Sequence, residues 1–407
     1  MALFSSSNKE ISVKMETRNF KRLSVVHIAL VLVSFMLALG VAEVGLRMAH
    51  YGEASRTPLE KLMEYDPLLG WQHKQNFSAR IVTDEYQTII HYNANRLADS
   101  GRSSHTQQAA SRLVVLGDSF VDGYTVPAQD VVTAALEALL PPQFEVINLG
   151  VVGYSTDQEL LLLEREGWTY QPDLVVLAFY YNDVWANGSR YLANSTTTQK
   201  PVFVLDADGN LNLTNVPVPY PQQTLHERFK LYDLIRNVVK GNHLLYSLAL
   251  EITAAHGNPS DNSSPAPTGA AGGAAEFKVY RKTETPELTR EWTITQALLR
   301  RMKHEIEQRG ARFVVFYVPT RIELSPEEWS SARLPPDYDP GTVARKLALI
   351  CATEDIPYID PSDRFREAQK RTPLYLRRDP HWNAAGHHLA AKILAEYIQS
   401  SWQGTHR

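Results

Sequence analysis

The sequence predicts an α/β domain of alternating strands and helices, preceded by one membrane-spanning helix. Two observations carry this prediction: short apolar runs alternate with amphipathic segments over residues 111–402, and twenty uncharged residues follow one another at 23–42. The chain has 407 residues, of which 44% are apolar and 21% charged, so it can bury a core. The formal net charge of −4 implies no strongly basic face, and nucleic acid is therefore not an expected partner.

Five nearly continuous apolar runs predict strands that are buried on both faces, as in a parallel sheet. They are RLVVLG (112–117), FEVINLG (144–150), DLVVLAFY (173–180), RFVVFYVP (312–319) and IPYID (356–360). Helical patterns occupy residues 128–140, 156–168, 288–310 and 384–402. This alternation favours a layered α/β fold.

Two stretches depart from the alternation. Residues 51–110 carry short alternating runs such as 79–93, which predict a small β-hairpin or cap. An insertion at about 185–287 separates the third strand from the fourth, and we expect it over one edge of the sheet's active face. Its Pro-, Gly-, Ala- and Ser-rich part, 256–275, predicts a mobile loop.

Residues 23–44 predict a single membrane anchor. As a helix, the uncharged stretch 23–42 would be about 30 Å long, which matches the hydrocarbon core of a bilayer. Five basic and two acidic residues precede it, so the positive-inside rule places the polar tail 1–22, which we expect to be disordered, in the cytoplasm. The rest of the chain would then be extracytoplasmic, either periplasmic or extracellular. A cleaved signal peptide is the alternative, because the small residues at 38–42 leave cleavage open.

Sites in open α/β sheets form beyond the carboxyl ends of the strands, so the residues after each strand deserve scrutiny. Ser119 follows the first strand and could be a nucleophile among backbone N–H groups, or it could simply cap the next helix. Gly150 and Gly153 follow the second strand and could offer a backbone N–H or form an ordinary turn. Asn182 follows the third strand, where its amide could stabilise an oxyanion or serve turn chemistry.

The stretch RRDPHWNAAGH (377–387) supplies a possible base near the C-terminus. His381 could accept a proton from Ser119, and Asp379 could orient the imidazole ring. Asn383 is a plausible N-cap for the closing helix. Each of these motifs is ambiguous alone, but together they supply every role of a serine-dependent acyl-transfer site.

The four motifs resemble the sequence blocks of the SGNH hydrolase superfamily, also called GDSL esterases and lipases. The matching residues are Gly117-Asp118-Ser119, Asn148-x-Gly150-x-x-Gly153, Asn182-Asp183 and Asp379-x-His381, and the likeness covers about 110–185 and 310–400. It implies a flavodoxin-like, three-layer α/β/α fold with a mostly parallel sheet, and a Ser-His-Asp mechanism. The implied triad is Ser119, His381 and Asp379, and the implied oxyanion hole is the Ser119 N–H, the Gly153 N–H and the Asn182 side chain. Gly153 fits the family position better than Gly150, which stays open.

Two departures from the family pattern matter. Tyr180 stands where the third block usually has glycine, and its ring should narrow the acyl pocket. The fourth block is one residue shorter than the usual Asp-x-x-His, so a backbone carbonyl could orient the His381 ring in place of Asp379. The short spacing is similar to that of the SGNH-like alginate O-acetyltransferases and related membrane-anchored proteins of exopolysaccharide pathways. The single anchor followed by Glu43-x-x-Leu46-Arg47 is similar to that group too.

Three functions are compatible with these residues. The first is a serine esterase that hydrolyses an ester on an acylated carbohydrate or small molecule. The second is an O-acyltransferase that uses the same triad and passes the acyl group to an exopolysaccharide hydroxyl. The third is a non-catalytic carbohydrate-binding or assembly protein on the same fold.

Other residues near the site have weaker patterns. Five residues could contact substrate: Asp118, Tyr154, Tyr180, Tyr181 and Trp185. The rings of the four aromatic residues could stack on sugars, or they could simply pack beneath the insertion. His387 and His388 fall on the closing helix, at least a turn from His381, so we expect neither a metal nor another cofactor. Cys351 is the only cysteine, which excludes an internal disulfide.

Overall fold

The computed structural model describes residues 5–49, 51, 61–98, 111–192, 195, 198–221, 228–241 and 277–402. The chain divides into two compact units, one of residues 1–56 and 222–262 and the other of residues 57–221 and 263–407. The predicted loop at 256–275 lies outside the described residues, as do positions 52–60 and 99–110 of the predicted cap.

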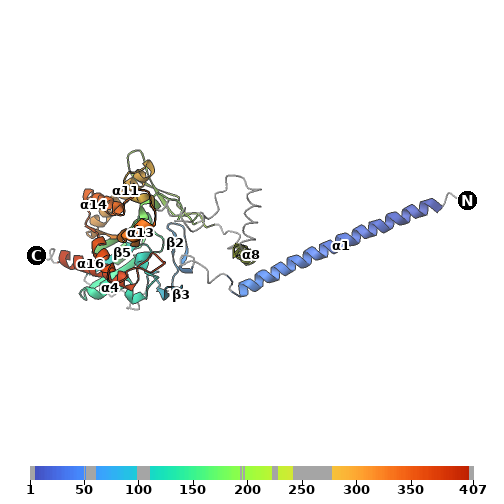
Figure 1. Ribbon diagram of the computed structural model, residues 1–407, viewed down its shortest axis with the longest axis horizontal. Helices are drawn as coiled ribbons and strands as arrows, with labels where there is room; N and C mark the ends of the chain where they lie inside the picture. Colours follow the sequence, from blue (N-terminus) through green and yellow to red (C-terminus); the bar gives the residue numbers. More distant parts are fainter. Residues whose placement is uncertain are drawn as a thin grey trace. The chain divides into compact units, whose positions relative to one another are not determined.

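A five-stranded parallel sheet forms the centre of the larger unit (Figure 1). Its strands are β5 (Ser111–Gly117), β6 (Phe144–Gly150), β7 (Leu174–Tyr180), β10 (Arg312–Val318) and β11 (Tyr358–Ile359). They lie in the order β6-β5-β7-β10-β11, which is the 2-1-3-4-5 order of flavodoxin-like sheets. All five predicted strands are therefore present, and the order reverses between β5 and β7, where such sheets bind their ligands.

Helices cover both faces of this sheet and complete a three-layer fold. Alternate strand residues face opposite layers: Val114 and Leu116 belong to one apolar core, and Leu113 and Val115 belong to the other. Figure 1 shows α11 and α14 on one side of β5 and α4 and α16 on the other. The main helices are α4 (Val132–Leu139), α5 (Thr156–Arg165), α11 (Pro286–Gln308), α14 (Thr342–Thr353), α15 (Ser362–Gln369) and α16 (Ala384–Trp402). The α/β/α architecture predicted from the sequence is confirmed.

Short elements lie at the strand ends and along the connections. The short α-helices are α3 (Ser119–Asp122), α6 (Asp183–Ala186), α12 (Arg321–Leu324) and α13 (Pro326–Ser331). The 3₁₀ turns are η1 (Ala128–Asp130), η2 (Gly167–Tyr170) and η3 (Phe277–Tyr280). The predicted helices at 128–140 and 156–168 are thus each shared between an α-helix and a 3₁₀ turn.

Three antiparallel hairpins accompany the sheet within the larger unit. They are β1 (Met63–Asp66) with β2 (Gly70–His73), β3 (Phe77–Val82) with β4 (Gln87–Tyr92), and β8 (Val202–Leu205) with β9 (Leu211–Thr214). The β3–β4 pair is the hairpin predicted at 79–93, with Ala79 opposite Ile90. Trp71 and Ile81 join the same core as α5 and α11, so the hairpins pack on the domain.

The smaller unit contains α1 (Ser5–Met48) and α8 (Lys230–Gly241). Within α1, the segment His27–Met48 is long and apolar enough to cross a membrane. None of its most apolar stretch is buried inside the protein. The Glu43 carboxylate accepts the backbone N–H groups of Lys230, at 3.1 Å, and Leu231, at 2.8 Å. The expectation that residues 1–22 are disordered is wrong for 5–22, which continue the helix; adding a residue to an existing helix is far less costly than starting one.

Candidate active site

Ser119 lies directly beyond the carboxyl end of β5, at the first position of α3. Asp118 caps this helix, since its carboxylate accepts the N–H of Phe120 at 2.9 Å. The Ser119 side chain is therefore not the helix cap that it could have been. The turn is tight, because a Cβ on Gly117 would lie 2.4 Å from the Val121 side chain. Glycine is needed there for the strand to enter the helix at once.

His381 reaches Ser119 across the carboxyl edge of the sheet. Its Nε2 lies 2.7 Å from the Ser119 Oγ, and its Nδ1 contacts an Oδ1 oxygen of Asp379. With a carboxylate on Nδ1, the ring carries its proton there and presents a free Nε2 to the hydroxyl. This arrangement can activate Ser119 as a nucleophile.

The one-residue spacer between Asp379 and His381 does not prevent this geometry. The same Oδ1 also accepts the backbone N–H of His381 at 3.0 Å, so the carboxylate folds back over its own turn to meet the ring. Burial raises the pKa of Asp379, but the hydrogen bonds from the His381 ring and backbone outweigh this and hold the pKa below its ordinary value. Asp379 is therefore ionised at neutral pH, as an orienting carboxylate must be. The group that the His381 Nδ1 contacts is thus the Asp379 carboxylate and not a backbone carbonyl.

Aromatic side chains enclose the imidazole. The Phe120 ring centroid lies 4.9 Å from that of His381, and Tyr124 meets His381 edge-on at 5.4 Å. Trp382, which is fully buried, packs against Phe120 at 4.9 Å. Asn383 accepts the N–H of Gly386 at 3.1 Å and so caps α16, as its position in the sequence predicts. These contacts limit the ring to the orientation that faces Ser119.

Gly153 and Asn182 line the same pocket as the nucleophile. The volume of this pocket is about 460 Å³, and His381 lines it too. Gly153 has a φ of +78°, a left-handed conformation that favours glycine. Gly150 is excluded from this role, because its N–H donates to the Asn148 side chain at 2.8 Å and it does not line the pocket. Backbone N–H groups and an amide so placed can stabilise a developing oxyanion.

Residues 278–407 match the sequence model of the family described as "SGNH hydrolase-like domain, acetyltransferase AlgX". The chain carries an SGNH hydrolase-like domain of the AlgX type. No curated protein matches the sequence.

Several solved structures resemble the SGNH hydrolase-like domain at low identity. The acetyl xylan esterase AlAXEase is 14% identical with a TM-score of 0.35, and the match covers 70% of this chain and 99% of that one. A lipase/acylhydrolase from Enterococcus faecalis is 14% identical with a TM-score of 0.34, over 72% and 96% of the two chains. A catalytic mutant of Axe2, an acetylxylan esterase from Geobacillus stearothermophilus, is 14% identical with a TM-score of 0.37, over 72% and 96%.

Two residues that the sequence analysis missed hold the base of the SGNH hydrolase-like domain in place. Glu85, in the turn between β3 and β4, accepts the backbone N–H groups of Arg378, at 2.8 and 2.9 Å, and Asp379, at 2.9 Å. Arg321 follows β10 and donates from Nη1 to the carbonyl oxygens of Leu376, at 2.7 Å, and Arg377, at 2.8 Å. Neither residue stands in a recognisable motif, and only the position of Arg321 just past a strand could have drawn attention to it.

Four of the five residues expected to contact substrate line the pocket: Asp118, Tyr180, Tyr181 and Trp185. Tyr154 does not, and its predicted role is wrong. Its side chain is 1% exposed and its hydroxyl donates to the carbonyl oxygen of Trp71 at 2.5 Å. The left-handed turn at Gly153 directs the next side chain into the core, away from the nucleophile. Pocket residues that the sequence analysis did not identify include Phe277, Thr320, Arg321 and Glu328.

His387 and His388, on α16, contact the start of α4 and the turn before it. Burial lowers the pKa of His387 to about 3, so the ring is neutral, and its Nδ1 accepts the N–H of Val132 at the start of α4 at 3.2 Å. His388 lies 2.9 Å from Asp130. Within the part of the chain that the structure describes, no group of three or more His, Cys, Asp and Glu side chains is arranged to hold a metal ion.

Proposed function

We propose that this protein is an extracytoplasmic O-acyltransferase that moves an acyl group from an ester donor to a polysaccharide hydroxyl through Ser119. The observation that carries the chemistry is the 2.7 Å contact between the Ser119 Oγ and the His381 Nε2, with Asp379 on the far side of the ring. The family match to the acetyltransferase AlgX favours transfer over the hydrolysis that the sequence analysis placed first.

The first half-reaction forms an acyl-enzyme. The Ser119 oxygen attacks the carbonyl carbon of the donor while the His381 Nε2 takes the hydroxyl proton, and the Asp379 carboxylate stabilises the imidazolium. The oxyanion of the tetrahedral intermediate is stabilised by the Ser119 and Gly153 N–H groups and the Asn182 amide. The bond from the carbonyl carbon to the donor's oxygen then breaks, and His381 returns the proton to that oxygen.

The second half-reaction reverses these steps with a new alcohol. A sugar hydroxyl enters the place of the released donor, and the His381 Nε2 takes its proton as its oxygen attacks the acyl-Ser119 carbonyl carbon. Collapse of the intermediate breaks the bond to the Ser119 oxygen, which regains a proton from the imidazolium. Transfer therefore requires that the pocket favour sugar over water in this step.

The lining of the pocket suits a sugar acceptor. Tyr181, Trp185 and Phe277 offer aromatic rings on which a pyranose face can stack, and Thr320 and Arg321 add polar groups. Tyr180 packs against Phe120 at a centroid distance of 4.7 Å and against Tyr181 at 4.7 Å. Its ring stands where the resemblance expects glycine, which supports a small acyl group such as acetyl.

Incubation of the full-length protein, in detergent, with p-nitrophenyl acetate tests the proposal. Nitrophenol release and acetylated product are measured with and without an unacetylated oligosaccharide, and Ser119→Ala is the matched control. We expect the oligosaccharide to gain acetyl groups and to accelerate release, and Ser119→Ala to do neither. Acceptor-independent release that dominates in both reactions would instead establish the esterase. If wild type releases no nitrophenol and a fluorophosphonate probe does not label it, the enzyme function is excluded and the binding-protein alternative stands.

Residues 23–44 are proposed to remain as the anchor that keeps the catalytic domain outside the cytoplasm. The apolar length of α1 and the basic residues before it support this orientation. Mass spectrometry of the protein extracted from membranes separates the two alternatives. A retained anchor gives the intact mass of 45.9 kDa, whereas a signal peptide gives a shorter chain that begins after residue 42 or nearby.

A further inference from the structure

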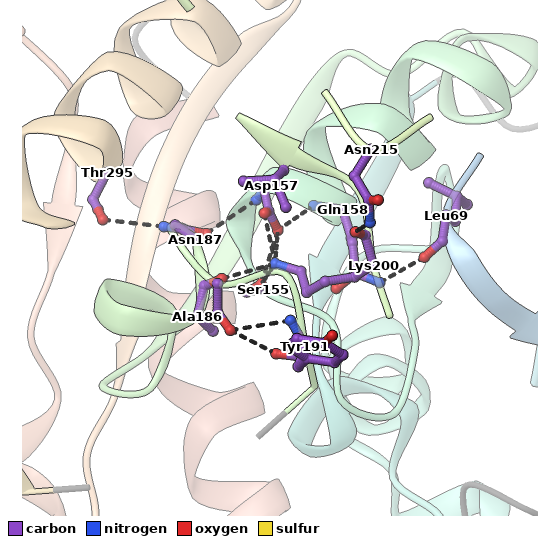
Figure 2. A network of polar contacts seen from close by, with 12 residues as sticks. Leu69, Ser155, Asp157, Gln158, Ala186, Asn187, Tyr191, Lys200, Asn215 and Thr295 are labelled. Atoms are coloured by element: carbon purple, nitrogen blue, oxygen red, sulfur yellow. Dashed lines mark hydrogen bonds and ion pairs between the residues drawn. The ribbon is translucent and has the colours of Figure 1, made fainter. Parts of the chain in front are cut away.

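Lys200 is a buried cation whose ammonium group is fully engaged (Figure 2). Its side chain is 1% exposed, and its Nζ donates to both carboxylate oxygens of Asp157, at 2.5 and 2.7 Å. The same Nζ donates to the Ser155 Oγ at 2.8 Å and to the carbonyl oxygen of Ala186 at 2.9 Å. Lysine is almost never buried to this extent unless it is paired. The burial of Lys200 with four hydrogen-bond acceptors therefore indicates a specific structural role.

The partners of Lys200 lie on the two segments that carry the oxyanion-hole groups. Ser155 and Asp157 follow Gly153 by two and four residues and open α5. Ala186 ends α6, the short helix that starts directly after Asn182. Lys200 itself comes from the insertion after the third strand, and it reaches between these two segments as Figure 2 shows.

Asn187 adds a second tie between the same segments. Its Oδ1 accepts the backbone N–H of Asp157 at 3.1 Å, and its Nδ2 donates to the Thr295 Oγ1 on α11 at 3.1 Å (Figure 2). Asn187 is fully buried, as is Asp157. The start of α5 and the end of α6 are therefore joined both through Asn187 and through Lys200.

We propose that Lys200 is a positioning residue that sets the distance between Gly153 and Asn182, and thereby tunes the oxyanion hole. The role rests on the proposed acyl transfer through Ser119. Oxyanion stabilisation depends on donors held in advance at the place where charge develops, so a shift of either segment weakens it. A tetrahedral ammonium that donates to Ser155 and Ala186 at once fixes both segments.

The surrounding charges explain why a cation is needed here. Burial raises the pKa values of Glu159 and Asp183 well above their ordinary values, and nearby carboxylates add to the shift. Burial also raises the pKa of Asp157, but the charge and hydrogen bonds of Lys200 oppose that effect. Lys200 thus allows an acceptor carboxylate to remain beside Ser155 in the interior.

The simpler alternative is that Lys200 only anchors the insertion to the domain. The two roles differ in what they predict for Asn182. If Lys200 acts through the oxyanion hole, its loss matters only while the Asn182 amide is present, and the two substitutions are not additive. If it only anchors the insertion, its loss has the same effect in either background.

The test compares two charge-neutral double variants of the full chain. Lys200→Met with Asp157→Asn removes the buried pair without leaving a lone charge. The matched control, Arg165→Met with Asp66→Asn, removes a 2.7 Å ion pair at the opposite end of α5, together with the contact of Arg165 to Glu166 at 2.5 Å. We expect the Lys200 variant to keep its KM within about threefold for p-nitrophenyl acetate while kcat and the rate of fluorophosphonate labelling fall about 10- to 100-fold. The control should change kcat less than about twofold.

The decisive measurement repeats the Lys200 variant in an Asn182→Ala background. We expect a further loss of no more than about threefold there, against 10- to 100-fold in wild type. Equal losses in both backgrounds, or an unchanged kcat in a folded variant, would overturn the positioning role. A wild type that fails to label overturns the proposed function itself, which is a different result from a labelled wild type that does not respond to Lys200.

Ser155→Ala keeps the inference testable if the double variant does not fold. It removes the bond from Lys200 to the Ser155 hydroxyl and the bond from that hydroxyl to Asp157, both at 2.8 Å, and leaves the ion pair intact. We expect kcat to fall about three- to tenfold with KM unchanged, and the loss to disappear in the Asn182→Ala background. A folded Ser155→Ala variant with wild-type kcat counts against the role of Lys200.

Discussion

The two halves of the candidate site are held in different ways. Ser119, Gly153 and Asn182 follow β5, β6 and β7 within three residues, so strands that are buried on both faces fix their places. Asp379 and His381 lie in the irregular segment 376–383, which has no strand or helix to position it. An isolated bridge between Tyr375 and Trp382 and side chains from distant parts of the domain hold that segment. The comparison predicts that every part of the base half depends on individual side-chain braces, whereas in the nucleophile half the strands place Ser119 and the Lys200 pair adjusts only the segments that carry Gly153 and Asn182.

Asp379→Asn should cause the largest loss among changes to the base half that leave the base itself in place. The asparagine can still accept the His381 backbone N–H, so the fold should be retained, but it no longer selects the reactive tautomer or stabilises the imidazolium. We expect kcat to fall about 10³-fold or more, close to the effect of His381→Ala. Rates of nitrophenol release with the full-length variants measure this.

The sequence alone left open whether a backbone carbonyl orients the ring in place of Asp379. If a backbone carbonyl oriented the ring, Asp379→Asn would lower kcat far less than His381→Ala does. A loss below about tenfold would show that another group holds the ring, in contradiction to the contact between the Asp379 carboxylate and Nδ1.

Glu85→Ala should cause the second-largest loss of kcat, because the Glu85 carboxylate accepts the backbone N–H groups of Arg378 and Asp379. Its pKa lies below the ordinary value, since the hydrogen bonds from this segment outweigh a partial loss of hydration. We expect kcat to fall about 10- to 50-fold with little change in thermal stability, because the turn is near the surface. Asp84→Ala, which removes only an exposed ion pair with Arg378, is the control and should stay within about twofold. Equal effects of the two substitutions would show that the turn does not position the base.

The difference between the halves also explains what could be predicted from the sequence. Ser119 and Asn182 could be found because each follows an apolar run, and the run itself fixes where the side chain emerges. Glu85 and Asp379 are 294 residues apart, and an acidic residue in a hairpin turn is indistinguishable from any other surface residue. Lys200 carries no periodic signal either, since its burial depends on two segments that meet only in the folded domain.

Glu85 and Lys200 were missed because they are distant in sequence from the groups they contact, whereas Tyr154 was wrongly predicted because it is close in sequence to a pocket residue. Its neighbour Gly153 does reach the pocket, and proximity in sequence suggested that Tyr154 would follow. A single left-handed residue reverses the direction of the next side chain, and the sequence cannot show which glycines adopt that conformation. The extent of α1 could not be predicted from the composition of its polar part. A polar segment can extend a helix that an adjacent apolar segment has already formed.

Arg321→Lys tests the second brace of the base half. The guanidinium donates from one nitrogen to two successive carbonyl oxygens and from Nε to Glu328 at 2.9 Å, a planar arrangement that an ammonium cannot reproduce. We expect kcat to fall about three- to tenfold, and the loss to be greater in a Glu85→Ala background if both braces hold one segment. Arg345→Lys, at an exposed ion pair with Asp339, is the control. Strict additivity of Arg321→Lys and Glu85→Ala would show that the two braces act on separate parts of the segment.

The smallest effect on activity, and the most informative about the nucleophile half, is expected for Asp118→Asn. Burial raises the pKa of Asp118 from its ordinary 3.8 to about 6, because the carboxylate loses hydration and its hydrogen bond with Phe120 compensates only in part. A folded-state pKa above the unfolded one means that the folded protein binds the proton more tightly, so stability is lost as pH rises from about 4 to about 6. Asparagine caps a helix as well as aspartate and has no charge to bury. We expect Asp118→Asn to raise the free energy of unfolding by about 1–3 kcal/mol at pH 7.5 and to leave it unchanged at pH 4, as measured by urea unfolding. A gain that is the same at both pH values would mean that the charge of the buried Asp118 carboxylate does not destabilise the fold, in contradiction to its raised pKa.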